Sequence, residues 1–228
     1  MRPIKNYYDD YRKYDSERST NYHNFVRNLE LEKIFKLAKE KNVLEVGCGT
    51  GLVLEKVSKI AKSAKGIDLS SGMLNNAKKK RLDVKQASAT NIPFKNNQFD
   101  VVYSLKVLPH VADIKKALEE MSRVTKKNGV LILEFYNPLS MKFITNRFMD
   151  YTFRNRTFSR YDTINDIKII LPENMKIEKV YGIRIFTPFG FVYGIPLISN
   201  IFKFLDKNLQ RSWLKIFAGY LLVVIRKD

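Results

Sequence analysis

The stretch that decides the fold is LEVGCGTG, residues 44–51, in which a short apolar run leads directly into three alternating glycines. Such a run is typical of a buried strand, and glycines are needed where a chain turns sharply or a ligand approaches the backbone. In open α/β sheets, ligands bind beyond the carboxyl ends of the strands. The stretch therefore predicts a strand, a ligand-binding turn at Gly47, Gly49 and Gly51, and a helix after it.

Short apolar runs and helical segments alternate on both sides of this turn. Strands are expected at residues 43–46, 65–68, 83–87, 99–104 and 130–135, with helices at 52–64, 70–81 and 114–125. The last helix should stop at Lys127, Asn128 and Gly129, because Asn and Gly tolerate the left-handed conformation. Strands and helices alternating at this spacing predict an α/β fold with a parallel sheet and helices on both faces.

The flanking regions have a different pattern. Residues 7–41 are expected to be helical, whereas a helix at 162–171 and strands at 176–185 and 216–226 are expected after the core. A chain of 228 residues fits one such domain. Its predicted parts are an N-terminal helical cap at 1–41, a ligand-binding core at 42–138, and a substrate-cap insertion with the C-terminal strands at 139–228.

Cysteine and histidine are scarce. Cys48 is the only cysteine, which excludes an intramolecular disulfide and any multi-cysteine metal site. His23 and His110 are too few to suggest a metal centre, so no metal is expected. The N-terminus lacks the apolar stretch of a secretory signal, and a cytoplasmic location is expected.

The formal charge of +18 has several explanations. A basic surface can serve nucleic acid, anionic lipid or an acidic small molecule. Here the lysines are scattered over the whole chain, and no arginine-rich arm or RNA-binding module stands out. Nucleic-acid binding is therefore left open but not favoured.

An apolar segment at residues 186–205 is interrupted by Pro188, Gly190, Gly194 and Pro196. These interruptions argue against a regular membrane-spanning helix. The segment is predicted to be a cap over a pocket, with an interfacial patch that makes peripheral membrane contact as the alternative.

Polar residues lie at or near the carboxyl ends of the first three predicted strands. Glu45 precedes the glycine turn, Asp68 ends the second strand, and Ser88 and Ala89 follow the third. Asp68 is placed to accept hydrogen bonds from both hydroxyls of a ribose, with helix capping as its alternative role. A dinucleotide fingerprint, GxGxxG, would need a glycine where Leu52 stands.

Four stretches resemble one family, the class I S-adenosylmethionine-dependent methyltransferases. The stretch at 44–51 resembles the first motif of that family, and GIDLSSGML at 66–74 resembles the segment with the ribose-binding acid. Residues 86–113 and 118–138 resemble the ubiquinone/menaquinone-biosynthesis-like branch, also called methyltransferase type 11. The resemblance implies a Rossmann-like seven-stranded sheet with a C-terminal antiparallel strand pair, and S-adenosyl-L-methionine as the cofactor.

The resemblance also implies a role for each site residue. The glycines would lie beside the methionine part of the cofactor, Asp68 at the ribose, and Leu105 near the reactive methyl group. In this family the region before the first strand often closes over the cofactor, which implies that role for Tyr14, with packing of the helix as its alternative. The cofactor-binding residues implied are Tyr14, Glu45, Gly47, Gly49, Gly51, Asp68, Leu69, Met73, Ser88, Ala89 and Leu105.

One position departs from the family pattern. The family usually has an aspartate where Ser88 stands, which accepts a hydrogen bond from the adenine amino group. A serine accepts such a bond without charge, so adenine recognition is expected to rely more on backbone groups.

The implied activity is methyl transfer to a small acceptor. His110 is the candidate general base, with a structural role as its alternative. The residues at 139–214 are rich in Phe, Tyr and Ile, so a hydrophobic or lipid-like acceptor is expected. An RNA methyltransferase or RNA-binding protein, and a non-catalytic cofactor-binding protein, stay open as alternatives.

Overall fold

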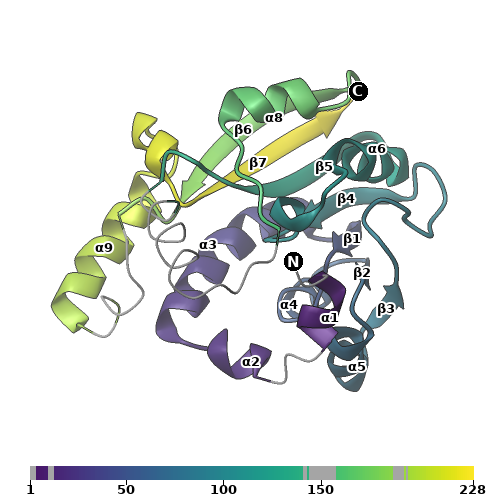
Figure 1. Cartoon of the computed structure of the whole chain (residues 1–228), viewed down its shortest axis with the longest axis horizontal. Coiled ribbons are helices and arrows are strands. Elements are labelled where there is room, and N and C mark those ends of the chain that lie inside the picture. The colour runs from purple at the N-terminus through teal and green to yellow at the C-terminus, as the bar shows by residue number, and fades with distance from the viewer. Residues whose placement is uncertain (1–3, 10–12, 141–142, 144–157, 187–192, 194) are drawn as a thin grey trace.

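The computed structural model describes residues 4–9, 13–140, 143, 158–186, 193 and 195–228. Within these residues, seven strands form one sheet in the order β3-β2-β1-β4-β5-β7-β6 (Figure 1). The first five strands are parallel, and β7 runs antiparallel to both β5 and β6. The strands are β1 Asn42–Val46, β2 Ser63–Asp68, β3 Asp83–Gln86, β4 Phe99–Ser104, β5 Thr125–Tyr136, β6 Met175–Ile183 and β7 Tyr220–Lys227. This topology confirms the predicted α/β sheet and its C-terminal antiparallel pair.

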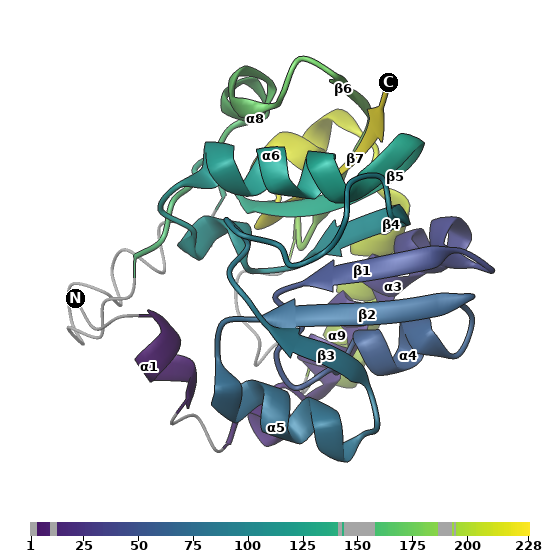
Figure 2. The same cartoon turned by 90° about the vertical axis from the view of Figure 1, so that its right-hand side faces the viewer.

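Helices cover both faces of the sheet, as predicted (Figure 2). On one face, α6 and α8 pack against strand residues such as Leu44 and Leu131. On the other face, α3 and α4 pack against the alternate residues, such as Val43 and Ile132. The helices are α1 Ile4–Asp9, α2 Tyr14–Glu17, α3 Asn21–Ala38, α4 Leu54–Ser58, α5 Ser71–Lys79, α6 Ile114–Val124, α8 Ile164–Ile170 and α9 Pro196–Asn208, with the 3-10 helices η1 Leu108–His110 and η3 Trp213–Phe217.

The region at 7–41 is mainly helical, as predicted, and its helical residues are divided among the end of α1, α2 and α3. Thr20 has an extended backbone, and its hydroxyl accepts a hydrogen bond from the backbone N–H of His23 at 3.3 Å. This N-cap starts α3 at Asn21 and separates it from α2.

Several element boundaries also differ from the prediction. The helix after the glycine turn is only Leu54–Ser58, because β2 already begins at Ser63. The helix predicted to stop at 127–129 ends at Val124, where Thr125 becomes extended and begins β5. The last strand begins at Tyr220 rather than at 216, since Trp213–Phe217 form η3.

The strand order reverses between β1 and β4, which lie side by side although β2 and β3 separate them in the sequence. In open α/β sheets, ligands bind beyond the carboxyl ends of the strands at such a reversal. The glycine turn follows β1 directly and therefore lies at this point.

The apolar segment at 186–205 falls partly outside the described residues, since 187–192 and 194 are not described. Its remaining part forms most of α9, a helix of 13 residues. Among the described residues, no helix is long and apolar enough to cross a bilayer.

Candidate active site

The glycine turn is held against β2. The backbone N–H groups of Gly47 and Cys48 donate to the carbonyl of Ile67 at 2.7 and 2.9 Å. Gly47 and Gly49 have φ values of +80° and +54°, a backbone region that residues with a side chain rarely adopt. A Cβ at Gly47 would lie 2.1 Å from the side chain of Val107, whereas a Cβ at Gly49 would meet no atom within 4 Å. Gly47 thus makes room for Val107, and Gly49 leaves backbone open to a ligand.

Gly51 has a different environment from the other two glycines. A Cβ there would lie 2.3 Å from Cδ1 of Leu82. Gly51 is also absent from the described residues that line the cavity. The structure therefore gives this predicted site residue a packing contact and places it outside the cavity wall.

Asp68 ends β2, and its carboxylate joins two loops. One oxygen accepts from the backbone N–H of Gly49 at 2.8 Å, and the other from that of Ser70 at 2.9 Å. The N-cap of α5 is Ser70, whose hydroxyl accepts from Met73 at 3.1 Å. Burial raises the pKa of Asp68 from its ordinary value. Each carboxylate oxygen has a second lone pair for a ligand hydroxyl.

Glu45 is buried next to the glycine turn. Its carboxylate accepts a hydrogen bond from the hydroxyl of Tyr103 at 2.9 Å. Burial raises the pKa of Glu45 to about 8. The group is therefore mostly protonated at pH 7, and a cation bound in the cavity would favour its ionised form.

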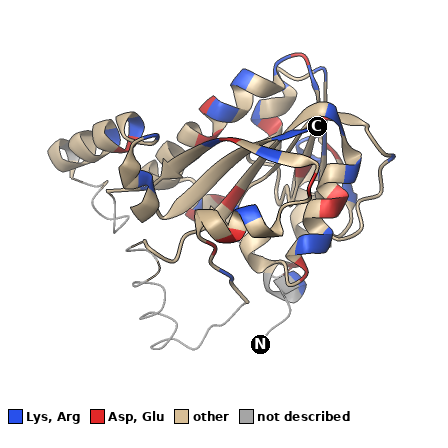
Figure 3. Cartoon of the chain, turned by 90° about the horizontal axis from the view of Figure 1, so that it is seen from above, with Lys and Arg blue, Asp and Glu red and all other residues tan. Residues whose placement is uncertain are grey.

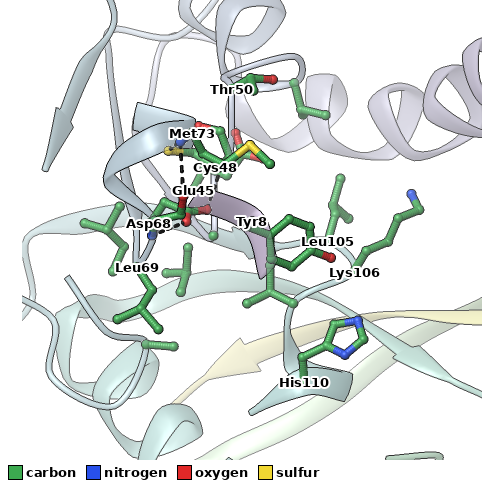
Figure 4. Close-up of a pocket in the computed structure, with 18 of the residues that line it drawn as sticks. Tyr8, Glu45, Cys48, Thr50, Asp68, Leu69, Met73, Leu105, Lys106 and His110 are labelled. Atoms are coloured by element: carbon green, nitrogen blue, oxygen red, sulfur yellow. Dashed lines mark hydrogen bonds between the residues drawn. The ribbon is translucent and has the colours of Figure 1, made fainter. Parts of the chain in front are cut away.

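One cavity brings most of the predicted residues together. Its volume is about 690 Å³, which lies within the roughly 300–1,000 Å³ of small-molecule sites. Asp68 and Leu69 lie on one side of it, and Leu105, Lys106 and His110 on the other (Figure 4). The predicted residues in its wall are Tyr14, Glu45, Gly47, Gly49, Asp68, Leu69, Met73, Ser88, Ala89, Leu105 and His110.

The loop after β3 supplies the polar edge expected at the adenine. The hydroxyls of Ser88 and Thr90 lie 2.8 Å apart, and Ser88 also accepts from the backbone N–H of Thr90 at 3.2 Å. The backbone N–H of Ala87 donates to the carbonyl of Asp68 at 3.0 Å. These bonds hold Ser88 and Ala89 beside the end of β2, in the cavity wall.

Two aspartates attach the N-terminal helices to the core. Asp9, in α1, accepts from the hydroxyl of Ser70 at 2.7 Å. Asp15, in α2, accepts from the hydroxyl of Thr50 at 2.5 Å. Both bonds lie close to the cofactor-side loops, and they hold the cap that places Tyr14 in the cavity wall.

Lys106 follows β4 with a left-handed backbone, φ +59°. Its ammonium pairs with Glu30, and lies 3.7 Å from a carboxylate oxygen of Glu134 and 5.4 Å from the ring centroid of Tyr220. Both carboxylates are buried. Although burial alone would lower it, the two carboxylates raise the pKa of Lys106 above its ordinary value. The charged side chain of Lys106 is thus fixed in the cavity wall.

His110 lies in η1, and its ring also borders the cavity. Its Nδ1 is 2.8 Å from the carbonyl oxygen of Phe158. A carbonyl only accepts, so Nδ1 carries the proton and Nε2 is the basic nitrogen of the neutral ring. The ring also packs edge-on against Tyr136, with centroids 5.7 Å apart. This arrangement is compatible with both the catalytic and the structural role.

Cations gather beside His23, which also lines the cavity. Burial, followed by the charges of Arg18, Lys106, Arg27 and Arg184, lowers the pKa of His23 to about 4. The neutral ring lies 3.1 Å from Nη1 of Arg18, which can donate to Nε2. The cavity is therefore electropositive on this side.

Sequence reasoning missed part of this wall. Tyr136 and Tyr220 both line the cavity, and they face each other in the register of β5 and β7. The first ends a parallel strand and the second begins its antiparallel neighbour, so both lie at the same edge of the sheet. Tyr22 and Lys106 were missed as well. The position of Lys106, two residues after a predicted strand, could have indicated it.

Some predicted acceptor-side residues cannot be placed. Residues 144–157 and 187–192 lie outside the described part of the chain. Of the described residues between 186 and 205, none lines this cavity. Within the described ranges, no group of three or more His, Cys, Asp or Glu side chains could hold a metal ion.

Known proteins share both the sequence motifs and the fold. A family model described as a methyltransferase domain matches residues 44–133. An uncharacterised protein of Methanocaldococcus jannaschii is 34% identical over 236 residues, covering 98% of this chain and 90% of that protein. The ubiquinone/menaquinone biosynthesis C-methyltransferase of Campylobacter jejuni is 38% identical over 109 residues, covering 43% of this chain and 46% of that enzyme. The chain thus spans less than half the length of this quinone enzyme.

A solved structure shows the same architecture. It is a methyltransferase from Thermotoga maritima that depends on S-adenosylmethionine and is described as a possible histamine N-methyltransferase. The TM-score is 0.72 at 20% identity, covering 94% of this chain and 96% of that one. At this identity, the likeness establishes the fold.

The chain belongs to the class I S-adenosylmethionine-dependent methyltransferases, on the combined ground of the sheet order, the glycine turn and the family match. S-adenosyl-L-methionine is its cofactor. Within this class, it is a member of the branch that contains the ubiquinone/menaquinone biosynthesis enzymes.

Proposed function

We propose that the chain transfers a methyl group from S-adenosylmethionine to a small acceptor with an apolar or aromatic body. The observation that carries this proposal is the continuity of one cavity from the glycine turn to the tyrosines of β5 and β7. One part of the wall fits a nucleoside, and the other part fits a second small molecule.

The cofactor part of the wall suits S-adenosylmethionine in its chemistry. The open space at Gly49 lets a ligand approach the backbone, and Asp68 offers acceptor atoms for ribose hydroxyls. Glu45 lies behind the turn, where a cationic sulfonium would stabilise its carboxylate. Tyr14 is proposed to face the cofactor, and an aromatic face stabilises a cation by about 0.5–2 kcal/mol.

The acceptor part combines aromatic rings with fixed cations. Tyr22, Tyr136 and Tyr220 supply large apolar surfaces with polar hydroxyls. Arg18 adds a positive charge to this part, and the ammonium of Lys106 is held there by the carboxylates of Glu30 and Glu134. We therefore propose that the acceptor is a planar or hydrophobic molecule with an acidic hydroxyl or a carboxylate on one edge. The name of the C. jejuni relative refers to quinone biosynthesis, which supports lipid-like aromatic rings as the first acceptors to test.

The cofactor, when bound, supplies a methyl group on a sulfonium, which transfers by in-line displacement without a covalent protein intermediate. The contribution of the chain is alignment and exclusion of water. The cap helices are proposed to close the cavity through the Asp9 and Asp15 bonds. His110 is proposed to accept the acceptor's proton at Nε2 where that proton is not already lost.

RNA stays a second acceptor to be tested because of the +18 charge. In Figure 3, the ribbon positions of Lys and Arg are spread over many elements and are interspersed with those of Asp and Glu. The cavity therefore supports a small-molecule acceptor, whereas the net charge does not by itself favour RNA.

The test is transfer of tritium from methyl-labelled S-adenosylmethionine to a panel of prenylated and simple hydroxy-aromatic compounds, aromatic carboxylic acids and total RNA. We expect labelled product with an aromatic acid or phenol, and at least a tenfold lower kcat/KM in Tyr220→Ala with unchanged cofactor affinity. Label in RNA alone would overturn the acceptor class. Cofactor binding without transfer to any extracted cell component would indicate a non-catalytic protein.

The role of His110 is tested with the same assay. If His110 is the base, His110→Gln lowers kcat and removes the acidic limb of the pH profile, while the KM for the acceptor stays unchanged. A purely structural role would lower the stability of the protein and leave the shape of the pH profile intact.

A further inference from the structure

Helix α9 has large apolar side chains on an exposed face and two of its polar side chains buried. Leu197, Ile201 and Phe204 are 75%, 54% and 66% exposed, and their i, i+4, i+7 spacing places them on one face. Ser199 and Asp206, by contrast, are buried. Asp206 accepts from the backbone N–H groups at 185 and 186, at 2.8 and 3.0 Å, which attaches the polar face to the protein. Helices that pack on a core have the opposite arrangement.

The exposed apolar surface continues past the helix. In η3, Trp213 is 70% exposed and Phe217 46% exposed, with ring centroids 6.2 Å apart. Eight of the twelve large hydrophobic residues that are exposed in the described part of the chain lie between 195 and 217. We call the following set the α9 surface: Leu197, Ile198, Ile201, Phe204, Trp213 and Phe217. Figure 1 shows α9 at the far left, projecting from the sheet.

The charges around the α9 surface have one sign. Lys203, Lys207, Arg211 and Lys215 lie in this segment, and Asp206 is the only acidic residue between 195 and 217. Asp206 is buried, and none of these four cations takes part in an ion pair with another described residue. A second copy of the chain would bring the same cations and another +18 of charge to the contact, which disfavours self-association. An anionic surface is the complementary partner.

The dimensions of α9 fit a position in the plane of a membrane. Its 13 residues extend about 20 Å at 1.5 Å per residue, short of the roughly 30 Å hydrocarbon core. Helices that lie at the interface have one apolar face flanked by Lys and Arg, and tryptophan is enriched at the headgroup level.

We propose that the α9 surface binds the headgroup region of an anionic lipid bilayer, with Leu197, Ile201, Phe204 and Trp213 inserted and the lysines in contact with phosphates. This binding does not depend on the identity of the methyl acceptor. It would hold the enzyme at a membrane, where apolar molecules accumulate.

The single tryptophan of the chain provides the probe, because Trp213 lies in the proposed contact. Protein is titrated with vesicles of phosphatidylcholine alone and of phosphatidylcholine mixed with phosphatidylglycerol. We expect a blue shift of Trp213 emission and quenching by lipids brominated near the headgroup, with at least tenfold stronger partition into the anionic vesicles. High salt should reverse most of this preference. Unchanged emission with anionic vesicles would overturn the proposal.

Matched variants distinguish specific membrane binding by the α9 surface from nonspecific adsorption of the protein to vesicles. Ile201→Ser with Phe204→Ser should lower the partition at least tenfold, and Lys207→Glu with Arg211→Glu should abolish the preference for anionic lipid. The controls are Ile169→Ser and Lys168→Glu on α8, where Ile169 is 75% exposed. Equal loss in the controls, or sedimentation showing a dimer that Phe204→Ser dissociates, would contradict membrane binding. All six substituted positions are exposed to solvent, so the affinity for S-adenosylmethionine should stay constant in every variant. An unchanged affinity then shows that the variant is folded.

Discussion

The two ends of the cavity are built in different ways. The cofactor end comes from loops that directly follow β1, β2 and β3, within residues 45–90. The acceptor end combines residues that are far apart in the sequence: Arg18 after α2, Lys106 after β4, and Tyr220 in β7. The first end depends on local backbone geometry, and the second on side chains that fold topology brings together. Substitutions at the two ends should therefore have different effects.

The largest effect is expected from Lys106→Met at the acceptor end. Removing the ammonium leaves Glu30 and Glu134 buried without their cation, which should lower the free energy of unfolding by about 3 kcal/mol. Urea denaturation measures this change. Lys65→Met is the control, because its pair with Asp83 lies on the surface and should contribute less than about 1 kcal/mol. Equal losses in the two variants would contradict the buried cluster.

Gly47→Ala and Gly49→Ala should separate packing from ligand access at the cofactor end. The Cβ at Gly47 collides with Val107 in a strained conformation, so stability should fall by about 2 kcal/mol. The Cβ at Gly49 enters open space, so backbone strain alone should lower the free energy of unfolding, by about 1 kcal/mol. The same Cβ should also weaken cofactor binding. Thermal unfolding and calorimetric titration of both variants test this. A larger stability loss at Gly49 than at Gly47 would be inconsistent with the geometry.

Glu45 should make cofactor affinity depend on pH. Its pKa of about 8 means that binding a sulfonium at pH 7 releases a proton, so affinity should rise several-fold between pH 7 and 9. For the same reason, the ligand-free protein should lose stability as pH rises from 4.5 to about 8, where the folded state binds more protons than the unfolded state. Glu45→Gln should flatten both profiles. A pH-independent affinity in the wild type would exclude this role.

The smallest effect is expected from Asp9→Asn in the cap. The Ser70 hydroxyl and the Gly72 amide lower the pKa of Asp9, so its contact should persist at neutral pH and weaken as pH falls through that lowered pKa. The variant should increase the dissociation rate of the cofactor about twofold, because Asn keeps an oxygen that accepts both hydrogen bonds and loses only the charge. Asp166→Asn is the control, because its pKa is also lowered, by the capping box of α8. An equal change of the dissociation rate in both variants would show that the contact of Asp9 does not hold the cap closed over the cofactor.

The sequence predicted the core of the fold and most of the cofactor-side wall, because strand ends and glycine turns have local signals. Asp68 and Gly49 are such cases. The breaks before α3 and after α4 were not predicted, since the Thr20 cap and the early start of β2 outweigh helical periodicity. Tyr136 and Tyr220 were missed because their meeting depends on the register of an antiparallel pair. For α9, a cap over the pocket and an interfacial patch both stayed open, since periodicity shows two faces of a helix but not which one is buried.

The most direct test of the account concerns Asp68, the carboxylate that is proposed to hold the ribose. Calorimetric titration with S-adenosylmethionine and with NAD is performed on wild type, Asp68→Ala and the surface control Asp83→Ala. We predict that only S-adenosylmethionine binds, and that Asp68→Ala alone weakens it at least tenfold, which corresponds to about 1.4 kcal/mol. Binding of NAD, or unchanged affinity in Asp68→Ala, would contradict the account.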